Sequence, residues 1–313
     1  MTIDSRLQTL MAAIATASGD QDAHASLPER RNAGRELMAG AQALVMTIPD
    51  PVADERDVLA ESPRAQVPLR VYRPRPGLLP ALIFIHGGGW WQGDLDSSDL
   101  ICRRRAAALD CAVISIGYRL APEHPYPVPL DDCWDAVRWI VENASELEID
   151  PDRVAITGGS AGGNLAAAVT LLARDAGGPT FIGQVLEQPV TDCTLGHASV
   201  DEYATGHGFT KAMYQESVDF YLQGHDPRDP LASPLLADLT KLPPALVITG
   251  ECDPLRDGGE LYAKGLQAAG VDTTLVRTAG MVHGAVELDL VVPDLAQQHW
   301  DAITHFLRPL LHP

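Results

Sequence analysis

The stretch Ile156-Thr157-Gly158-Gly159-Ser160-Ala161-Gly162-Gly163-Asn164-Leu165 joins two different sequence patterns. It continues a β-branched run from Val154 that is typical of a buried strand, and it leads into Leu165 to Val169, whose small and apolar residues predict a helix. The pattern Gly-x-Ser-x-Gly between a strand and a helix is typical of a tight turn that holds a serine hydroxyl clear of the sheet. Glycines are needed there because neighbouring chain passes very close. Ser160 is therefore a candidate nucleophile.

Apolar strand patterns alternate with helical patterns on both sides of this turn. Two early segments, 56–60 and 67–73, alternate like an antiparallel pair. Further strands are expected at 81–85, 111–116, 153–157, 181–186, 245–250 and 273–277, and helices at 130–141, 160–174, 256–269 and 295–307. This alternation predicts an α/β fold with a mostly parallel sheet covered by helices on both faces. Binding sites in such sheets gather at the carboxyl ends of the strands.

Two segments lack the strand pattern. Residues 1–50 are helical in character with an irregular middle from 18 to 28, and residues 191–233 contain a helical piece at 211–222 among turn residues. We expect residues 1–50 to form the N-terminal part of a helical cap. The rest, 51–313, would be the catalytic domain, with 191–233 inserted as the second part of the cap.

A serine hydroxyl needs a base within hydrogen-bond reach, and histidine is the usual one because its pKa lies near 6.5. His283 lies just past the last expected strand, and Asp253 follows the strand that ends at Gly250. A carboxylate beside the base would fix its tautomer. Glu251 is an alternative as a carboxylate at the strand end, and Asp257 is the second choice, although it could instead contact Arg256 at a helix start.

The attack of a serine on a carbonyl creates an oxyanion, which needs preorganised N–H donors. His86-Gly87-Gly88-Gly89 offers backbone without side chains, so the amides of Gly87, Gly88 and Ala161 are the candidates. A plain loop or a phosphate-binding turn is the alternative for a glycine triplet. No Gly-x-Gly-x-x-Gly and no Gly-Lys-Ser/Thr pattern accompanies it, which argues against nucleotide binding.

The composition excludes several other functions. Among 313 residues there are 42 acidic and 23 basic side chains, a net charge of −19 that argues against a nucleic-acid partner. Five scattered cysteines without a Cys-x-x-Cys pair indicate neither a metal site nor disulfides, and reduced thiols fit a cytoplasmic protein. Residues 7–17 repeat apolar positions at helical spacing and resemble an amphipathic helix more than a signal peptide. No run approaches the roughly 18 apolar residues of a membrane span, so no stable membrane association is expected.

Five motifs follow one another along the chain: His86 to Trp90, Tyr118 to Pro125, Gly159 to Asn164, Cys252 to Asp257, and the loop around His283. Their types and order resemble the bacterial hormone-sensitive-lipase family (family IV) of carboxylesterases. The resemblance implies an α/β-hydrolase fold of eight strands, carboxylesterase activity without a cofactor, and a cap made from the N-terminal region and the insertion after the sixth strand.

The chain departs from this family at two places. The residue before the nucleophile, usually acidic in the family, is Gly159. The strand before Pro189 ends in Glu187-Gln188, where an apolar residue and an aromatic residue are more usual. One hypothesis is that Glu187 replaces the missing carboxylate beside the turn, and the alternative is that Glu187 only caps the strand end.

The substrate is expected to be a small ester with a short to medium acyl chain, because a cap bounds the pocket. Trp90 and Trp91 are candidates for lining it, although one of two adjacent residues more often packs into the core. The segment from Tyr118 to Pro125 is expected to support the Gly87 loop, with Arg119 and Glu123 paired.

Two other functions stay open. An amidase, such as an arylformamidase, would use the same residues, and a non-catalytic binding protein, such as the plant gibberellin receptors, would share the fold. Those receptors lack the catalytic histidine, whereas His283 is present here. Family members often pair through the last strand of the sheet, so a homodimer through residues 273–277 is a further expectation.

Overall fold

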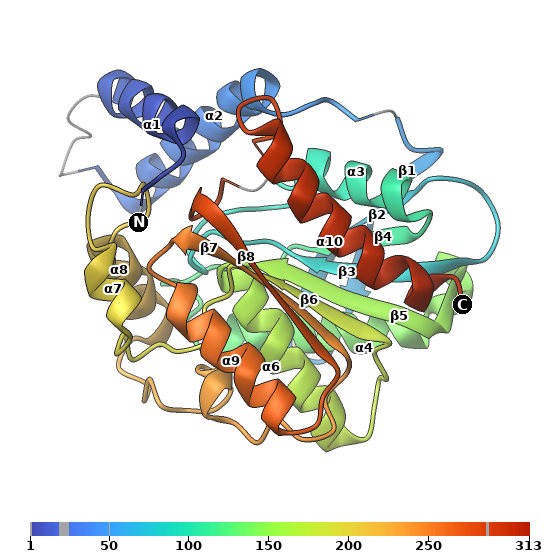
Figure 1. The fold of residues 1–313 in the computed structure, drawn as a ribbon. Helices are drawn as coiled ribbons and strands as arrows, with labels where there is room; N and C mark the ends of the chain where they lie inside the picture. The colour runs from blue at the N-terminus through green and yellow to red at the C-terminus, as the bar shows by residue number, and fades with distance from the viewer. Residues whose placement is uncertain (1, 19–24, 50, 286–287) are drawn as a thin grey trace.

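Eight strands form one sheet in the order β1-β2-β4-β3-β5-β6-β7-β8 (Figure 1). The computed structural model describes residues 2–18, 25–49, 51–285 and 288–313. β2 pairs antiparallel with both β1 and β4, and every other pairing is parallel, which confirms the predicted mostly parallel sheet. The strands are β1 (Asp54–Glu61), β2 (Gln66–Arg73), β3 (Leu79–Ile85), β4 (Ala112–Ile116), β5 (Ile149–Gly159), β6 (Gly183–Glu187), β7 (Ala245–Cys252) and β8 (Thr273–Val282).

Helices cover both faces of the sheet (Figure 1). On one face lie α3 (Asp99–Leu109) and α10 (Pro293–Leu311), and on the other lie α4 (Val128–Glu142), α6 (Ala161–Ala176) and α9 (Arg256–Ala268). A single turn of helix, α5 (Ala144–Leu147), precedes β5, and a short 3-10 helix, η1 (Pro234–Leu236), precedes β7.

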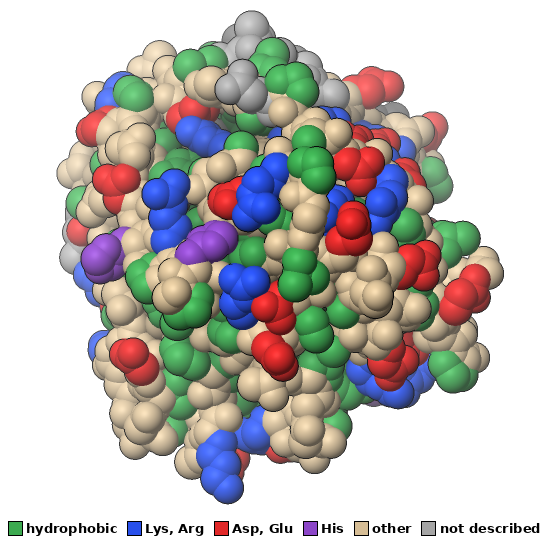
Figure 2. Space-filling view, turned by 90° about the vertical axis from the view of Figure 1, so that its right-hand side faces the viewer, with side chains coloured by type: hydrophobic (Ala, Val, Ile, Leu, Met, Phe, Trp, Pro, Cys, Tyr) green, Lys and Arg blue, Asp and Glu red, His purple; other side chains and the backbone are tan. Residues whose placement is uncertain are grey.

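The surface mixes the two signs of charge despite the acidic excess. Exposed pairs such as Arg75–Asp110 (2.9 Å) and Arg138–Glu142 (3.5 Å) join opposite charges, although each such pair adds little stability. Figure 2 shows acidic and basic side chains interspersed over one face of the molecule. In the part of the chain that the structure describes, no helix is both long enough and apolar enough to span a membrane.

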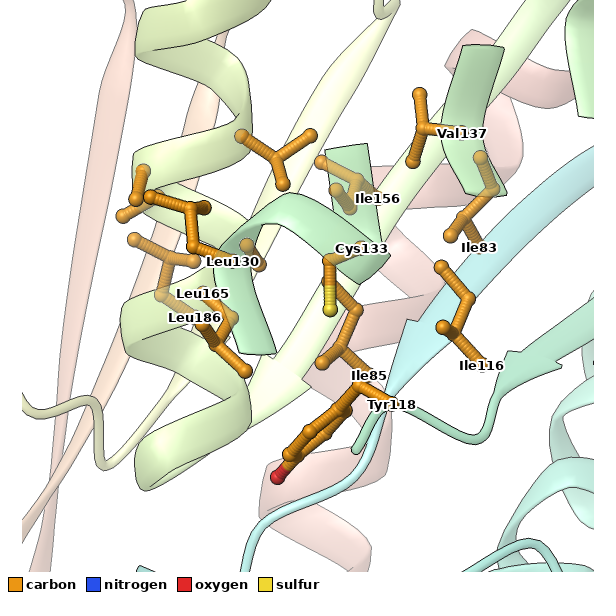
Figure 3. Close-up of a cluster of buried hydrophobic side chains, with 14 of the residues drawn as sticks. Ile83, Ile85, Ile116, Tyr118, Leu130, Cys133, Val137, Ile156, Leu165 and Leu186 are labelled. Carbon is orange, nitrogen blue, oxygen red and sulfur yellow. The ribbon is translucent and has the colours of Figure 1, made fainter. Parts of the chain in front are cut away.

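The larger core lies between the sheet and α4, α6 and α9. Every residue of β3 is buried, as the continuous apolar run predicts for a strand covered on both faces. Figure 3 shows one part of this core, where side chains of α4 pack on neighbouring strands. These side chains are Leu130, Cys133 and Val137 of α4, Ile83 and Ile85 of β3, Ile116 of β4, Ile156 of β5 and Leu186 of β6.

Several elements differ from the sequence-based expectation, including the short helix α5, the start of β5 at Ile149, helix α3 and strand β8. Helix α3 was not expected at all, because Arg103, Arg104 and Arg105 interrupt any apolar stripe in its sequence. Strand β8 runs five residues beyond 277, through Gly280 to Val282. Its extension places His283 immediately after the strand, at the edge of the sheet.

Four helices outside the sheet layers lie at the carboxyl ends of the strands (Figure 1). They are α1 (Ser5–Ser18), α2 (Leu27–Val45), α7 (Ala198–Glu202) and α8 (Lys211–Leu222), the last with the bounds expected from sequence. Arg30 of α2 pairs with Glu216 of α8 through two contacts of 2.9 and 2.7 Å. Leu7 of α1 packs in one cluster with Tyr203 and Met281. Most of the irregular segment expected at 18–28 lies outside the described residues.

Candidate active site

Ser160 occupies the turn between β5 and α6 with φ 56° and ψ −120°, a backbone conformation that L-residues rarely adopt. Its amide donates to the carbonyl of Glu187 (2.9 Å), and its own carbonyl accepts from the amide of Val190 (3.1 Å). A side chain at Gly158 would place its first carbon 2.3 Å from the carbonyl oxygen of Gly162. The glycines therefore leave the space that this turn requires.

Three side chains from three loops meet at this edge of the sheet. The Nε2 atom of His283 lies 3.0 Å from Ser160 Oγ, and its Nδ1 atom lies 2.9 Å from Asp253 Oδ2. Asp253 is fully buried, and its other carboxylate oxygen accepts from the amide of Leu255 (2.8 Å). This geometry places a base beside the serine and a carboxylate behind the base.

The two alternative carboxylates make other contacts. Glu251 accepts a hydrogen bond from the amide of Gly280 (2.9 Å). Asp257 accepts from the amide of Ser199 (2.9 Å) and from Arg256 (2.9 Å), which is the structural role considered for it from the sequence.

The loop that follows β3 lies against Ser160. A side chain at Gly87 would place its first carbon 3.5 Å from the Cβ atom of Ser160. Gly88 has φ 108°, and a side chain there would collide with the carbonyl of Gln92 at 2.2 Å. Within the described residues, the N–H groups of Gly87, Gly88 and Ala161 donate no hydrogen bond to the protein. They can therefore serve a ligand oxygen.

His86 and Tyr118 support this loop through hydrogen bonds to its backbone and through stacking of their rings. Burial lowers the pKa of His86 to about 4, so its ring is neutral at pH 7 and Nδ1–H donates to the carbonyl of Gly87 (2.8 Å). The Tyr118 ring stacks on the His86 ring at 4.2 Å, and its hydroxyl donates to the His86 carbonyl (3.0 Å). These contacts are the support expected from the segment that begins at Tyr118.

The expected pairing of Arg119 with Glu123 is wrong. Arg119 binds Asp132 with contacts of 2.8 and 2.6 Å, and Glu123 binds Arg31 with contacts of 2.7 and 2.6 Å. Asp132 lies 13 positions from Arg119 and Arg31 lies 92 positions from Glu123, so neither partner falls within the local segment from Tyr118 to Pro125.

The two tryptophans have different surroundings. Trp90 is fully buried and stacks on Tyr221 at 4.2 Å with the rings nearly parallel, so its expected place in the substrate pocket is corrected to a place in the core. Trp91 meets the edge of Phe220 at 5.7 Å and lies 4.8 Å beneath the guanidinium of Arg30. It joins the loop after β3 to α2 and α8, and its role in lining the pocket stays a prediction.

Glu187 is buried on the face of the sheet that carries α3 and α10. Its carboxylate accepts from Arg105 (2.8 Å), His299 (2.6 Å) and Thr157 (3.2 Å). Burial alone would raise the pKa of Glu187, but Arg105 and His299 outweigh it and hold that pKa well below its usual range. A side chain at Gly159 would start 4.0 Å from the Glu187 Cβ atom, so both positions share one face of the sheet. This proximity agrees with the hypothesis of a relocated carboxylate.

Two residues beside His283 were not assigned a role from the sequence. The Phe209 ring lies 4.6 Å from the imidazole of His283. Gln188 bonds to the backbone on either side of His283. The only sequence signal for Gln188 was its departure from the usual aromatic residue, and Phe209 lies in a segment whose path to the site no local pattern reveals.

The sheet topology, the turn at Ser160 and the loops around it define an α/β hydrolase. A family model described as "alpha/beta hydrolase fold" matches residues 82–287, and the chain belongs to this family, among the hormone-sensitive-lipase type (family IV).

Several proteins similar to this chain are named for the hydrolysis of carboxylic esters. Carboxylesterase NlhH of Mycobacterium tuberculosis is 44% identical over 239 residues, which cover 74% of this chain and 75% of that protein. Carboxylic ester hydrolase LipN of the same organism is 43% identical over 261 residues, which cover 80% of this chain and 69% of that protein. The crystal structure of EstE1, a thermostable carboxylesterase from a metagenomic library, matches with a TM-score of 0.88 at 39% identity, covering 94% of this chain and all of that one. The chain is accordingly a carboxylic ester hydrolase.

Proposed function

We propose that the chain hydrolyses short- to medium-chain acyl esters with Ser160 as nucleophile, His283 as base and Asp253 as the carboxylate that orients it. The observation that carries this proposal is the continuous series of contacts from Asp253 through His283 to Ser160, at 2.9 and 3.0 Å. The imidazole can take a proton from Ser160 because one ring nitrogen lies within hydrogen-bond distance of the serine, while the other lies within hydrogen-bond distance of Asp253.

In the first step, Ser160 Oγ attacks the ester carbonyl carbon while His283 Nε2 takes the hydroxyl proton. The N–H groups of Gly87, Gly88 and Ala161 are proposed to stabilise the negative charge on the former carbonyl oxygen. The bond to the alcohol then breaks, and His283 returns the proton to the leaving oxygen. Water repeats the sequence on the acyl-enzyme, which releases the acid and restores the serine.

We propose that α1 and α2, together with residues 191–233, form a cap that limits the length of the acyl chain. The ion pair between Arg30 and Glu216 joins the two parts of this cap. Phe209, from the second part, lies against the imidazole of His283 and would bound the space beside the acyl group. Trp91 is retained as a candidate wall of the same pocket.

The substitution Ser160→Ala tests this function. Removal of the nucleophile should lower kcat for p-nitrophenyl butyrate by at least about a thousandfold while the circular dichroism spectrum stays unchanged.

Two further measurements address the substrate. A series of p-nitrophenyl esters from acetate to laurate should give the highest kcat/KM at or below octanoate. Matched ester and amide substrates separate the esterase from an amidase, and an amide rate equal to the ester rate would favour the amidase.

The proposed ligand is a small ester, without a nucleic-acid partner. A net charge of −19 would repel a phosphate backbone. A cytoplasmic location and a homodimer through β8 stay predictions, and light scattering of the purified chain tests the second.

A further inference from the structure

Gln188 follows β6 at a point where the backbone changes direction. It has φ 45°, its amide donates to the carbonyl of Ile248 (2.7 Å), and only 3% of the residue is exposed. The turn aims the side chain across the end of β7, where a side chain at Gly250 would start 2.6 Å from the Gln188 Nε2 atom. Because Gly250 has no side chain, the Gln188 carboxamide has room to reach the loop around His283.

The carboxamide of Gln188 bonds to both peptide groups that flank His283. Its Nε2 atom donates to the carbonyl of Val282 (3.0 Å), and its Oε1 atom accepts from the amide of Gly284 (2.8 Å). A residue of a neighbouring parallel strand would make these same two bonds with its backbone N–H and C=O. Since the pairing of β7 with β8 ends at Cys252 and Val282, the side chain continues the pairing one residue further.

His283 needs this support because the chain turns sharply around it. Gly280 and Gly284 have φ of 66° and 73°. The imidazole must reach Asp253 and Ser160 at the same time, and an error of about 1 Å in the position of a reacting group can lower a rate by 100-fold.

We propose that Gln188 is a positioning residue that holds His283 in line with Ser160 and Asp253, through one hydrogen bond donated and one accepted. This proposal rests on the proposed function, in which His283 is the base. Gln188 acts through the backbone of the histidine loop and has no part in the proton transfer itself.

The first test replaces Gln188 by methionine, which has a similar shape and neither hydrogen bond. We expect kcat for p-nitrophenyl butyrate to fall by about 10- to 100-fold with KM changed by less than about twofold, because the base is displaced while the pocket remains. Gln184→Met is the matched control, since Gln184 is a buried glutamine of β6, the strand that Gln188 follows, and its side chain bonds to the Pro243 carbonyl (3.2 Å). It should keep the wild-type kcat. A folded Gln188→Met variant with kcat within threefold of the wild type would overturn the proposal.

A second variant decides the question if the methionine variant does not fold. In Gln188→Glu, a protonated carboxyl group can donate to Val282 and accept from Gly284, whereas the carboxylate can only accept. The ratio of its kcat to that of the wild type should therefore fall at least tenfold as pH rises from 5.5 to 8.5. A ratio that is constant over this range would overturn the proposal, because a merely structural role has no reason to follow this ionisation.

Parallel measurements keep the two proposals apart. If Ser160→Ala and His283→Ala retain activity, the proposed function fails, whatever the Gln188 variants do. If both lose activity and Gln188→Met does not, only the positioning role of Gln188 is wrong.

Discussion

At the residue scale, Glu187 is the most consequential departure from the family pattern. Its carboxylate is buried with Arg105 and His299, and its backbone carbonyl holds the amide of Ser160. Glu187→Gln removes the buried negative charge that Arg105 and His299 both contact, so we expect the free energy of unfolding to fall by about 3 to 5 kcal/mol and kcat to fall as well. Urea denaturation and steady-state kinetics measure the two effects.

The control for this variant is Glu216→Gln, which breaks the more exposed pair with Arg30 and should cost no more than about 1 kcal/mol. If Glu187→Gln leaves both stability and activity unchanged, the idea that Glu187 replaces the acidic residue missing at position 159 fails.

His86 gives a second prediction at the residue scale. Burial lowers its folded-state pKa from 6.5 to about 4, so the unfolded chain binds a proton between these values that the folded chain does not. Above pH 6.5, His86 therefore has almost no effect on the free energy of unfolding. As pH falls below 6.5, protonation of His86 in the unfolded chain lowers the free energy of unfolding, by about 2 kcal/mol at pH 5. In His86→Gln, the drop in unfolding free energy between pH 7 and 5 should be smaller by this amount, and parallel curves for the two proteins would contradict the assignment.

At the scale of single elements, Arg31 is one of the residues that join helix α2 to the loop after β3. Its side chain donates to the carbonyls of Trp91 (2.6 Å) and Ala121 (2.6 Å) and pairs with Glu123. If α2 is part of a cap that limits chain length, Arg31→Met should loosen this wall and raise the octanoate-to-butyrate ratio of kcat/KM by roughly three- to tenfold, about 1 kcal/mol. The control Arg35→Met removes an exposed arginine of the same helix that pairs with Asp94, and it should leave the ratio unchanged. An unchanged ratio in Arg31→Met would argue against the cap.

Elements with a strong local pattern could be predicted from the sequence, and elements defined by distant partners could not. The apolar run of β3 and the small-residue helix α6 follow from propensity and periodicity. The sequence of helix α3 has no apolar stripe that would predict it, because its buried Arg105 binds Glu187, 82 positions away. The predicted pairing of Arg119 with Glu123 is wrong for the same reason. Their long side chains bind partners that only the folded chain brings near.

At the scale of the whole molecule, the topology explains why the proposed site residues could be recognised before the fold was known. Parallel strands end at one edge of the sheet, so Ser160 after β5, Asp253 after β7 and His283 after β8 meet although 123 positions separate the first from the last. The positioning contacts of Gln188 could not be predicted in this way. They depend on a left-handed turn and on the space above Gly250, neither of which has a local sequence signature.

The central claim is that Ser160 carries the acyl group during turnover. Its most direct test is acid quenching of the enzyme during hydrolysis of p-nitrophenyl butyrate, followed by mass spectrometry of its peptides. We predict a butyryl adduct on Ser160 in the wild type and none in Ser160→Ala. In Gln188→Met, a larger amount of this adduct would mean that the substitution slows deacylation more than acylation. An adduct on another residue, or turnover by Ser160→Ala close to that of the wild type, would contradict this account.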